Sequence, residues 1–225
     1  MMDFTPFFEK YRQLVRQVDA VFLRVQQEFG GLVRCKVGCS DCCHALFDLT
    51  LIEALHLKTQ FDEQYKNEAR AQVIERADTA DRAIYRLKRQ AFKAHEKGKP
   101  ENQILEEIAE HRVRCPLLNE RDQCDMYTDR PITCRLYGIP TAIGGKAHTC
   151  GMSGFERGRA YPTVKLDDIL AALYDLSAEL AQQIGSRYGK LGELLVPVSM
   201  ALLTDYSEAY LGVQTNQNPN EEKVD

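Results

Sequence analysis

The chain of 225 residues has room for one domain, and 44% hydrophobic residues is an ordinary value for a globular protein. Its formal charge of -4, from 29 basic and 33 acidic residues, gives no basic field for wrapping nucleic acid. The N-terminus lacks a basic segment followed by an apolar one, and no apolar run approaches the ~18 residues of a membrane helix. We therefore expect a cytoplasmic protein without nucleic-acid or membrane partners.

The first predicted element is an amphipathic helix over residues 4–29. Phe, Tyr and Val side chains recur there at alternating spacings of four and three residues, which places one apolar stripe along a helix. Thr5-Pro6 suits the start of this helix and Gly30-Gly31 suits its end. The stripe predicts a core helix; a dimer contact is the alternative, so the oligomeric state, monomer or dimer, stays open.

Four thiols then fall within nine residues, at Cys35, Cys39, Cys42 and Cys43. In a reducing cytosol such closely spaced cysteines are metal ligands or redox groups rather than disulfides. Thr50 and Glu53 match a capping box, which predicts a second helix beginning a few residues later. The first thiol cluster is therefore expected in a loop between two helices.

Residues 62–98 are charged and rich in helix-forming residues, with an apolar position every three or four residues. This pattern predicts one long helix, or two, with a solvated charged face. Gly98-Lys99-Pro100 breaks the pattern, and Glu101 to Arg112 is helical again.

The segment over residues 115–162 is irregular, because glycines and prolines recur too often for long regular elements. The other four thiols lie here, at Cys115, Cys124, Cys134 and Cys150. Short strands are expected only around Tyr137 to Ile143. Metal ligation would supply the missing order, since binding free energy at a structural site is folding free energy.

Two further helical stretches follow, over residues 167–184 and over residues 191–211, the second interrupted or started at Pro197. Residues 213–225 have no apolar periodicity and predict a disordered tail. We expect a mainly α protein with few or no strands: one helical domain over residues 1–212 that contains the cysteine-cluster region 35–150.

The spacing of Cys35, Cys39 and Cys42 is C-x3-C-x2-C, which resembles the signature of radical S-adenosylmethionine enzymes, where three thiolates hold three irons of one [4Fe-4S] cluster. The strands and helices that alternate in those enzymes are not predicted here, so the spacing indicates a cluster without the radical reaction. The adjacent Cys42 and Cys43 cannot easily converge on one tetrahedral ion but can reach different irons. A structural zinc site is the alternative, and a redox-active pair or a spare buried cysteine remains open among the eight.

Three motifs carry a resemblance to a known family: Cys35-x3-Cys39-x2-Cys42-Cys43, then Arg114-Cys115-Pro116-Leu117-Leu118, then Cys124-x2-Tyr127-x2-Arg130-Pro131-x2-Cys134-Arg135-x-Tyr137-Gly138. Over residues 35–150 the chain resembles the bacterial YkgJ-like family named for its C-x2-C-x2-C-C pattern, although the first gap here is three residues. The resemblance implies a zinc- or iron-chelating or iron–sulfur protein. The chain is also similar to the cysteine-rich part of flagellin lysine N-methylases, which makes a cluster-dependent protein-modifying enzyme a further alternative. No nucleotide-binding or hydrolase motif is evident, so whether it is an enzyme stays open.

We expect cysteines of both clusters to share one metal centre, or two adjacent ones, with [4Fe-4S] favoured over zinc as the cofactor. The first choices as ligands are Cys35, Cys39, Cys42 and Cys134, whereas Cys43, Cys115, Cys124 and Cys150 complete the site or line it. The biological role would be electron transfer, sensing or structure, with a protein partner possible.

Residues near the thiols are expected to support the cofactor. Arg130 and Arg135 flank Cys134 and would either offset the negative charge of a cluster or pair with a carboxylate. Tyr127 and Tyr137 would pack over the site. His44 and His148 lie next to cysteines and are expected to contact ligands rather than bind the metal.

Overall fold

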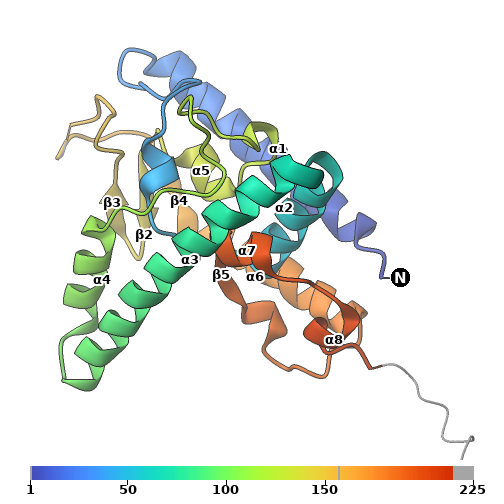
Figure 1. Cartoon of the computed structure of the whole chain (residues 1–225). Helices are drawn as coiled ribbons and strands as arrows, with labels where there is room; N and C mark the ends of the chain where they lie inside the picture. The colour runs from blue at the N-terminus through green and yellow to red at the C-terminus, as the bar shows by residue number, and fades with distance from the viewer. Residues whose placement is uncertain (1, 157, 215–225) are drawn as a thin grey trace, which may run out of the picture.

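The computed structural model describes residues 2–156 and 158–214, and helices make up most of its regular structure (Figure 1). The predicted mainly α fold is confirmed. The longer helices are α1 (Thr5–Glu28), α2 (Leu51–Gln64), α3 (Asn67–Glu96), α4 (Glu101–Glu110) and α6 (Leu166–Gln183). The shorter ones are α5 (Ile132–Leu136), α7 (Val198–Leu203) and α8 (Glu208–Leu211), with 3₁₀ turns η1 (Asp41–His44), η2 (Tyr127–Asp129) and η3 (Leu191–Glu193).

Helix α1 confirms the first prediction. It has Pro6 in its first turn, and at its end the N–H of Phe29 donates to the carbonyl of Val25. The predicted stripe turns inward, with Tyr11, Val18 and Val25 buried. This face packs against α2, α5 and α6, so the described chain uses the stripe for its own core.

Helix α2 is the centre of the molecule, because its first seven residues are all buried. The predicted capping box is present, with the Thr50 side chain accepting the backbone N–H of Glu53. The Glu53 carboxylate accepts two hydrogen bonds from Thr50, one from its backbone N–H over 3.2 Å and one from its hydroxyl over 3.0 Å. Glu53 accepts a third hydrogen bond, over 3.1 Å, from the N–H of Ile132 in α5. One buried carboxylate therefore joins the start of α2 to the start of the helix that carries Cys134.

Helix α3 is a single helix of 30 residues, drawn as the long diagonal of Figure 1. Residues 62–64 of the predicted segment instead end α2. The buried residues of α3, Val73, Ala77 and Ala80, lie in the first half of this helix, which packs against α7. Gly98, at a φ of +83°, turns the chain into α4, so α3 and α4 form a helical hairpin. In the sequence this hairpin lies between the two thiol clusters.

Two small sheets complete the fold. In one, β1 (Asp48–Thr50) pairs antiparallel with β5 (Leu195–Pro197). In the other, β2 (Thr141–Ile143) lies between β3 (Lys146–His148), its antiparallel neighbour, and β4 (Val164–Lys165), its parallel neighbour. Strand β2 falls within the predicted range Tyr137 to Ile143.

The predicted helical stretch over residues 191–211 is only partly helical. Residues Leu195–Pro197 are strand, because β1 supplies a partner about 150 positions earlier in the chain, and only α7 and α8 are α-helical. Pro197 has no N–H to donate and ends the strand at the N-cap of α7, in agreement with the predicted break.

Two apolar clusters form the core. One joins α1, α2, α5 and α6; the other joins α2, α3 and α7 and includes Leu117 and Met126 from the irregular segment. Of the predicted tail, residues 215–225 lie outside the described residues, and Val213 forms a β-bridge with Ser186. Among the described residues, no helix is long and apolar enough to cross a membrane.

Candidate metal centre

Six of the eight cysteines line one cavity of about 270 Å³: Cys39, Cys42, Cys43, Cys115, Cys124 and Cys134. Most of the other residues in the wall are apolar, among them Leu46, Phe47, Pro116, Leu117 and Val198. The cavity therefore combines a cluster of sulfur atoms with largely apolar surroundings.

Backbone hydrogen bonds hold the two thiol segments side by side. The N–H of Cys115 donates to the carbonyl of Cys43 over 2.7 Å, and the N–H of Val113 donates to the carbonyl of His44 over 3.1 Å. These bonds involve the main chain next to the thiols themselves. The relative position of the two segments is thus fixed by the polypeptide.

The thiols of the cavity lie close enough in pairs to shift each other's pKa. Cys42 interacts with Cys134 and Cys43 with Cys124, and Cys42 and Cys43 also interact with each other. The neighbouring side chains of Cys42 and Cys43 therefore reach different partners. No group of three or more His, Cys, Asp or Glu side chains in the described ranges converges on a single point as a preformed ion site.

Hydrogen bonding divides each pair into a proton donor and an acceptor. Bonds to Cys134 and Cys43 hold the pKa of Cys42 below its ordinary value, and the bond to Cys43 does the same for the pKa of Cys124. The pKa values of Cys43 and Cys134 are correspondingly raised. Burial raises the pKa of Cys115 to about 12. The thiols of the cavity thus differ in how readily each becomes the thiolate that binds a metal ion.

This donor set fits zinc or iron, because thiolates select soft metals and the sulfurs are gathered from both clusters. Cys42, Cys43, Cys124 and Cys134 would hold such a group, with Cys39 and Cys115 beside them.

Cys35 and Cys150 lie apart from this cavity. Cys35 packs against Gly138, where an added Cβ would come within 2.5 Å of the Cys35 Cβ, yet it remains close enough to Cys39 and Cys42 for their charges to raise its pKa, after the larger effect of burial. The Cys150 thiol donates to Asp41 over 3.2 Å and accepts from the N–H of Met152 over 3.3 Å. Cys150 is therefore already engaged elsewhere.

The two arginines that flank Cys134 have different surroundings. Arg130 lines the thiol cavity, with its guanidinium 3.6 Å from the centre of the Tyr127 ring, and its charge lowers the pKa values of Cys42 and Cys124 in addition to their hydrogen bonds. Arg135 instead forms an ion pair with Asp19 over 2.8 Å and is only 9% exposed. Arg130 thus favours negative charge on sulfur, whereas Arg135 ties α5 to α1.

The remaining predicted residues divide in the same way. Tyr127 lines the thiol cavity. Tyr137 lies outside its lining, near Asp41 and Arg112. His44 places Nδ1 3.0 Å from the carbonyl oxygen of Ser40, and His148 is exposed on β3.

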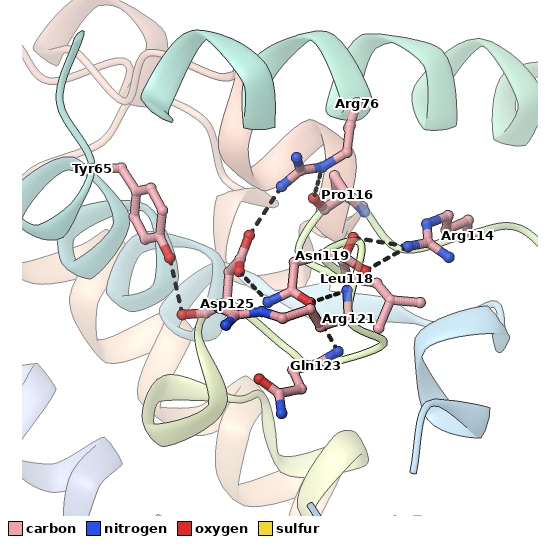
Figure 2. Close-up of polar contacts among 9 residues, drawn as sticks. All are labelled: Tyr65, Arg76, Arg114, Pro116, Leu118, Asn119, Arg121, Gln123 and Asp125. Atoms are coloured by element: carbon pink, nitrogen blue, oxygen red, sulfur yellow. Dashed lines mark hydrogen bonds and ion pairs between the residues drawn. The ribbon is translucent and has the colours of Figure 1, made fainter. Parts of the chain in front are cut away.

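A polar network that the sequence analysis missed orients the segment between Cys115 and Cys124 (Figure 2). From α3, the Arg76 Nε donates to the carbonyl of Pro116 over 2.8 Å, and its Nη2 donates to the Asp125 carboxylate over 3.0 Å. The Tyr65 hydroxyl donates to the Asp125 carbonyl over 3.1 Å. A signal did exist: Arg76 stands three residues after Val73 and four before Ala80, on the buried face of its helix.

Asn119 folds the chain back between the two cysteines. Its Oδ1 accepts the N–H groups of Arg121 and Gln123 over 2.9 and 3.1 Å, and its Nδ2 donates to Asp125 over 2.9 Å. This turn, closed by a β-bridge between Leu118 and Cys124, brings both ends of the segment to the cavity.

The family comparison agrees with this arrangement. The CxxCxxCC family model, described as a "Putative zinc- or iron-chelating domain", matches residues 34–151. No curated protein and no solved structure matches the chain. The matched residues make up just over half of the sequence and include all eight cysteines. The chain therefore belongs to the CxxCxxCC family of zinc- or iron-chelating cysteine-cluster domains.

Proposed function

We propose that the protein carries an iron–sulfur cluster, of the [4Fe-4S] type, in the cavity between the two thiol segments. The observation that carries this proposal is that six thiols line one cavity of about 270 Å³. One zinc ion takes four ligands at a single point, whereas a cluster distributes its ligands over several irons. The divergence of Cys42 and Cys43 toward Cys134 and Cys124 suits ligands that reach separate irons.

Cys42, Cys43, Cys124 and Cys134 are the ligands that we assign first, because they line the cavity and their thiols interact in pairs across the two segments. Cys39 and Cys115 follow, since they line the same cavity. Cys35, which the spacing placed in the first group, does not line the cavity, although the charges of Cys39 and Cys42 reach it.

When bound, such a cluster accepts or gives up one electron at a time. The chain would tune that property through its own groups. The Arg130 guanidinium would favour the more negative form of the cluster, and the apolar side chains of Leu46, Phe47 and Val198 would limit the contact of the cluster with water. The centre would lie near the surface, because Tyr127, in its wall, is 40% exposed. We therefore propose an electron-carrying role.

The test is an anaerobic purification of the full chain with iron, acid-labile sulfide and zinc counted against protein. We expect roughly four irons and four sulfides per chain and a broad absorption band near ~400 nm. The Cys42→Ser variant should lose most of the iron, whereas Cys150→Ser, the matched control outside the cavity, should keep it. A colourless protein holding only zinc would refute the cluster.

A structural zinc site is the second candidate, and the description of the family, which names zinc beside iron, favours it. Four of the six cavity thiols would complete a closed tetrahedral site. Roughly one zinc per chain, no sulfide, and unfolding on chelation would support zinc in place of the cluster.

A further inference from the structure

A second, larger cavity adjoins the thiol cavity. This cleft, of about 710 Å³, lies between α1 and the segments around residues 35–37 and 127–135. Its volume is in the range of small-molecule sites, ~300–1,000 Å³. It shares Val37, Tyr127 and Arg130 with the thiol cavity, so these residues form a wall common to both.

The cleft is lined by more positive than negative charge. Five basic side chains line it, Arg12, Arg16, Lys36, Arg130 and Arg135, against the carboxylates of Asp19 and Asp129. Asp19 is already paired with Arg135. Neither Arg16 nor Lys36 forms an ion pair with any residue that the structure describes. The cleft thus has cationic groups free to contact an anion.

Two buried polar side chains line the cleft at its inner end. Tyr11 is 2% exposed and His56 is 5% exposed, and the two rings lie 5.0 Å apart. Burial lowers the pKa of His56 to about 4, so at neutral pH its ring offers one donor and one acceptor. Both side chains line the cleft, so their polar groups are placed to meet a ligand there.

Beside its charged residues, α1 contributes three apolar side chains to the wall of the cleft, Val15, Phe22 and Leu23. We propose that this cleft binds a small organic anion, in which a carboxylate or phosphate group contacts Arg16 and Lys36 and an apolar or aromatic body reaches Tyr11 and His56. Arginine forks match the geometry of both kinds of anion. The bound molecule would lie against the Tyr127–Arg130 wall, next to the thiols.

The test is isothermal titration of the full chain, anaerobically purified and with its metal counted, using phenyl phosphate and benzoate as probes and benzylamine as the cation of similar shape. We expect saturable binding of at least one anion and none of benzylamine. Arg16→Gln should weaken binding at least ~10-fold, because a charge-assisted hydrogen bond is lost. Arg24→Gln, which makes the same change on α1 outside the cleft lining, should leave it unchanged.

Tyr11→Phe separates a ligand contact from a structural one. This change removes only the hydroxyl and keeps the ring, so binding should weaken ~3- to 10-fold while the melting temperature stays the same. Three results would overturn the inference: no binding of either anion, equal binding of benzylamine, or equal effects of Arg16→Gln and Arg24→Gln. If any of these results were found in a protein with a full iron complement, the proposal of a cluster would stand and that of an anion site would fall. If a protein holding only zinc bound the anion, the proposal of a cluster would fall and that of an anion site would stand.

Discussion

The Arg76–Asp125 pair offers the sharpest test of how the later thiol segment is held. Arg76 on α3 donates to the Pro116 carbonyl and to Asp125, on either side of the turn between Cys115 and Cys124. A double-mutant cycle of Arg76→Ala and Asp125→Ala measures the energy of this connection. The same cycle on Arg82 and Asp78, an exposed pair four residues apart on the same helix, is the matched control.

The magnitude follows from the contacts. Arg76→Ala removes two hydrogen bonds, of 2.8 and 3.0 Å, and a charge-assisted bond contributes about 1.5–3 kcal/mol. Water reaches both side chains, which are 27% and 17% exposed, so we expect a total loss of ~2–3 kcal/mol. Arg76→Ala alone loses the bond to Pro116, and Asp125→Ala alone loses the bond to Asn119, so neither bond enters the coupling energy of the cycle. The Arg76–Asp125 bond that remains should give a coupling energy of ~1–2 kcal/mol. The exposed control pair should couple by only ~0.3–0.5 kcal/mol.

The assay is urea unfolding of each variant at matched metal content, together with the rate at which a chelator removes the metal. Variants in which the turn between Cys115 and Cys124 is held less firmly should also release metal faster than the parent chain. A coupling no larger than that of the control pair, or unchanged release in Arg76→Ala, would show that the turn is positioned by other contacts.

Three further predictions concern the fold around the centre. Gly138→Ala should lower both folded yield and metal content, as measured by circular dichroism and metal analysis, since the new Cβ would lie 2.5 Å from the Cys35 Cβ; Gly151→Ala, which meets nothing within 4 Å, should do neither. Burial raises the pKa of Glu53 above 4.5, so protonation of this carboxyl contributes stability that is present below pH 4.5 and is lost as pH rises through the folded-state pKa. In urea unfolding, the free energy lost in Glu53→Gln should therefore be smaller at pH 7 than at pH 4. A larger loss at pH 7 would contradict this. Leu202→Ala, at a fully buried position of α7, should cost about 2–5 kcal/mol in the same assay, against little for Leu195→Ala, whose side chain is 42% exposed.

Local sequence signals predicted most of the helices. The stripe over residues 4–29, the Thr50–Glu53 box and the break at Gly98 each depend on residues within one or two turns of each other, and all three are present. The strand at Leu195–Pro197 was missed, because its partner β1 lies far away in the sequence and no local pattern reveals such a pairing.

The site divides along the same line. The sequence gathered all eight cysteines as candidates, but spacing could not show that Cys42 and Cys43 contact Cys134 and Cys124, or that Cys150 donates to Asp41. Arg130 and Arg135 were indistinguishable as neighbours of Cys134; only the approach of Asp19 from α1 separates them. The role of Arg76 was missed for the same reason, because its hydrogen-bond partner lies in a turn about forty residues later in the chain.

The hydrogen bonds of Cys115 to Cys43 and of Val113 to His44 bear on how the centre is assembled. A cross-link between the thiol segments closes a loop of seventy-one intervening residues, which in an unfolded chain would cost ~4 kcal/mol of entropy. The two backbone hydrogen bonds close the same loop, so loop closure and ligand binding each lower the entropy cost that the other must overcome. We therefore expect a change that weakens the pairing of residues 43–44 with residues 113–115 to lower the metal affinity of the centre as well.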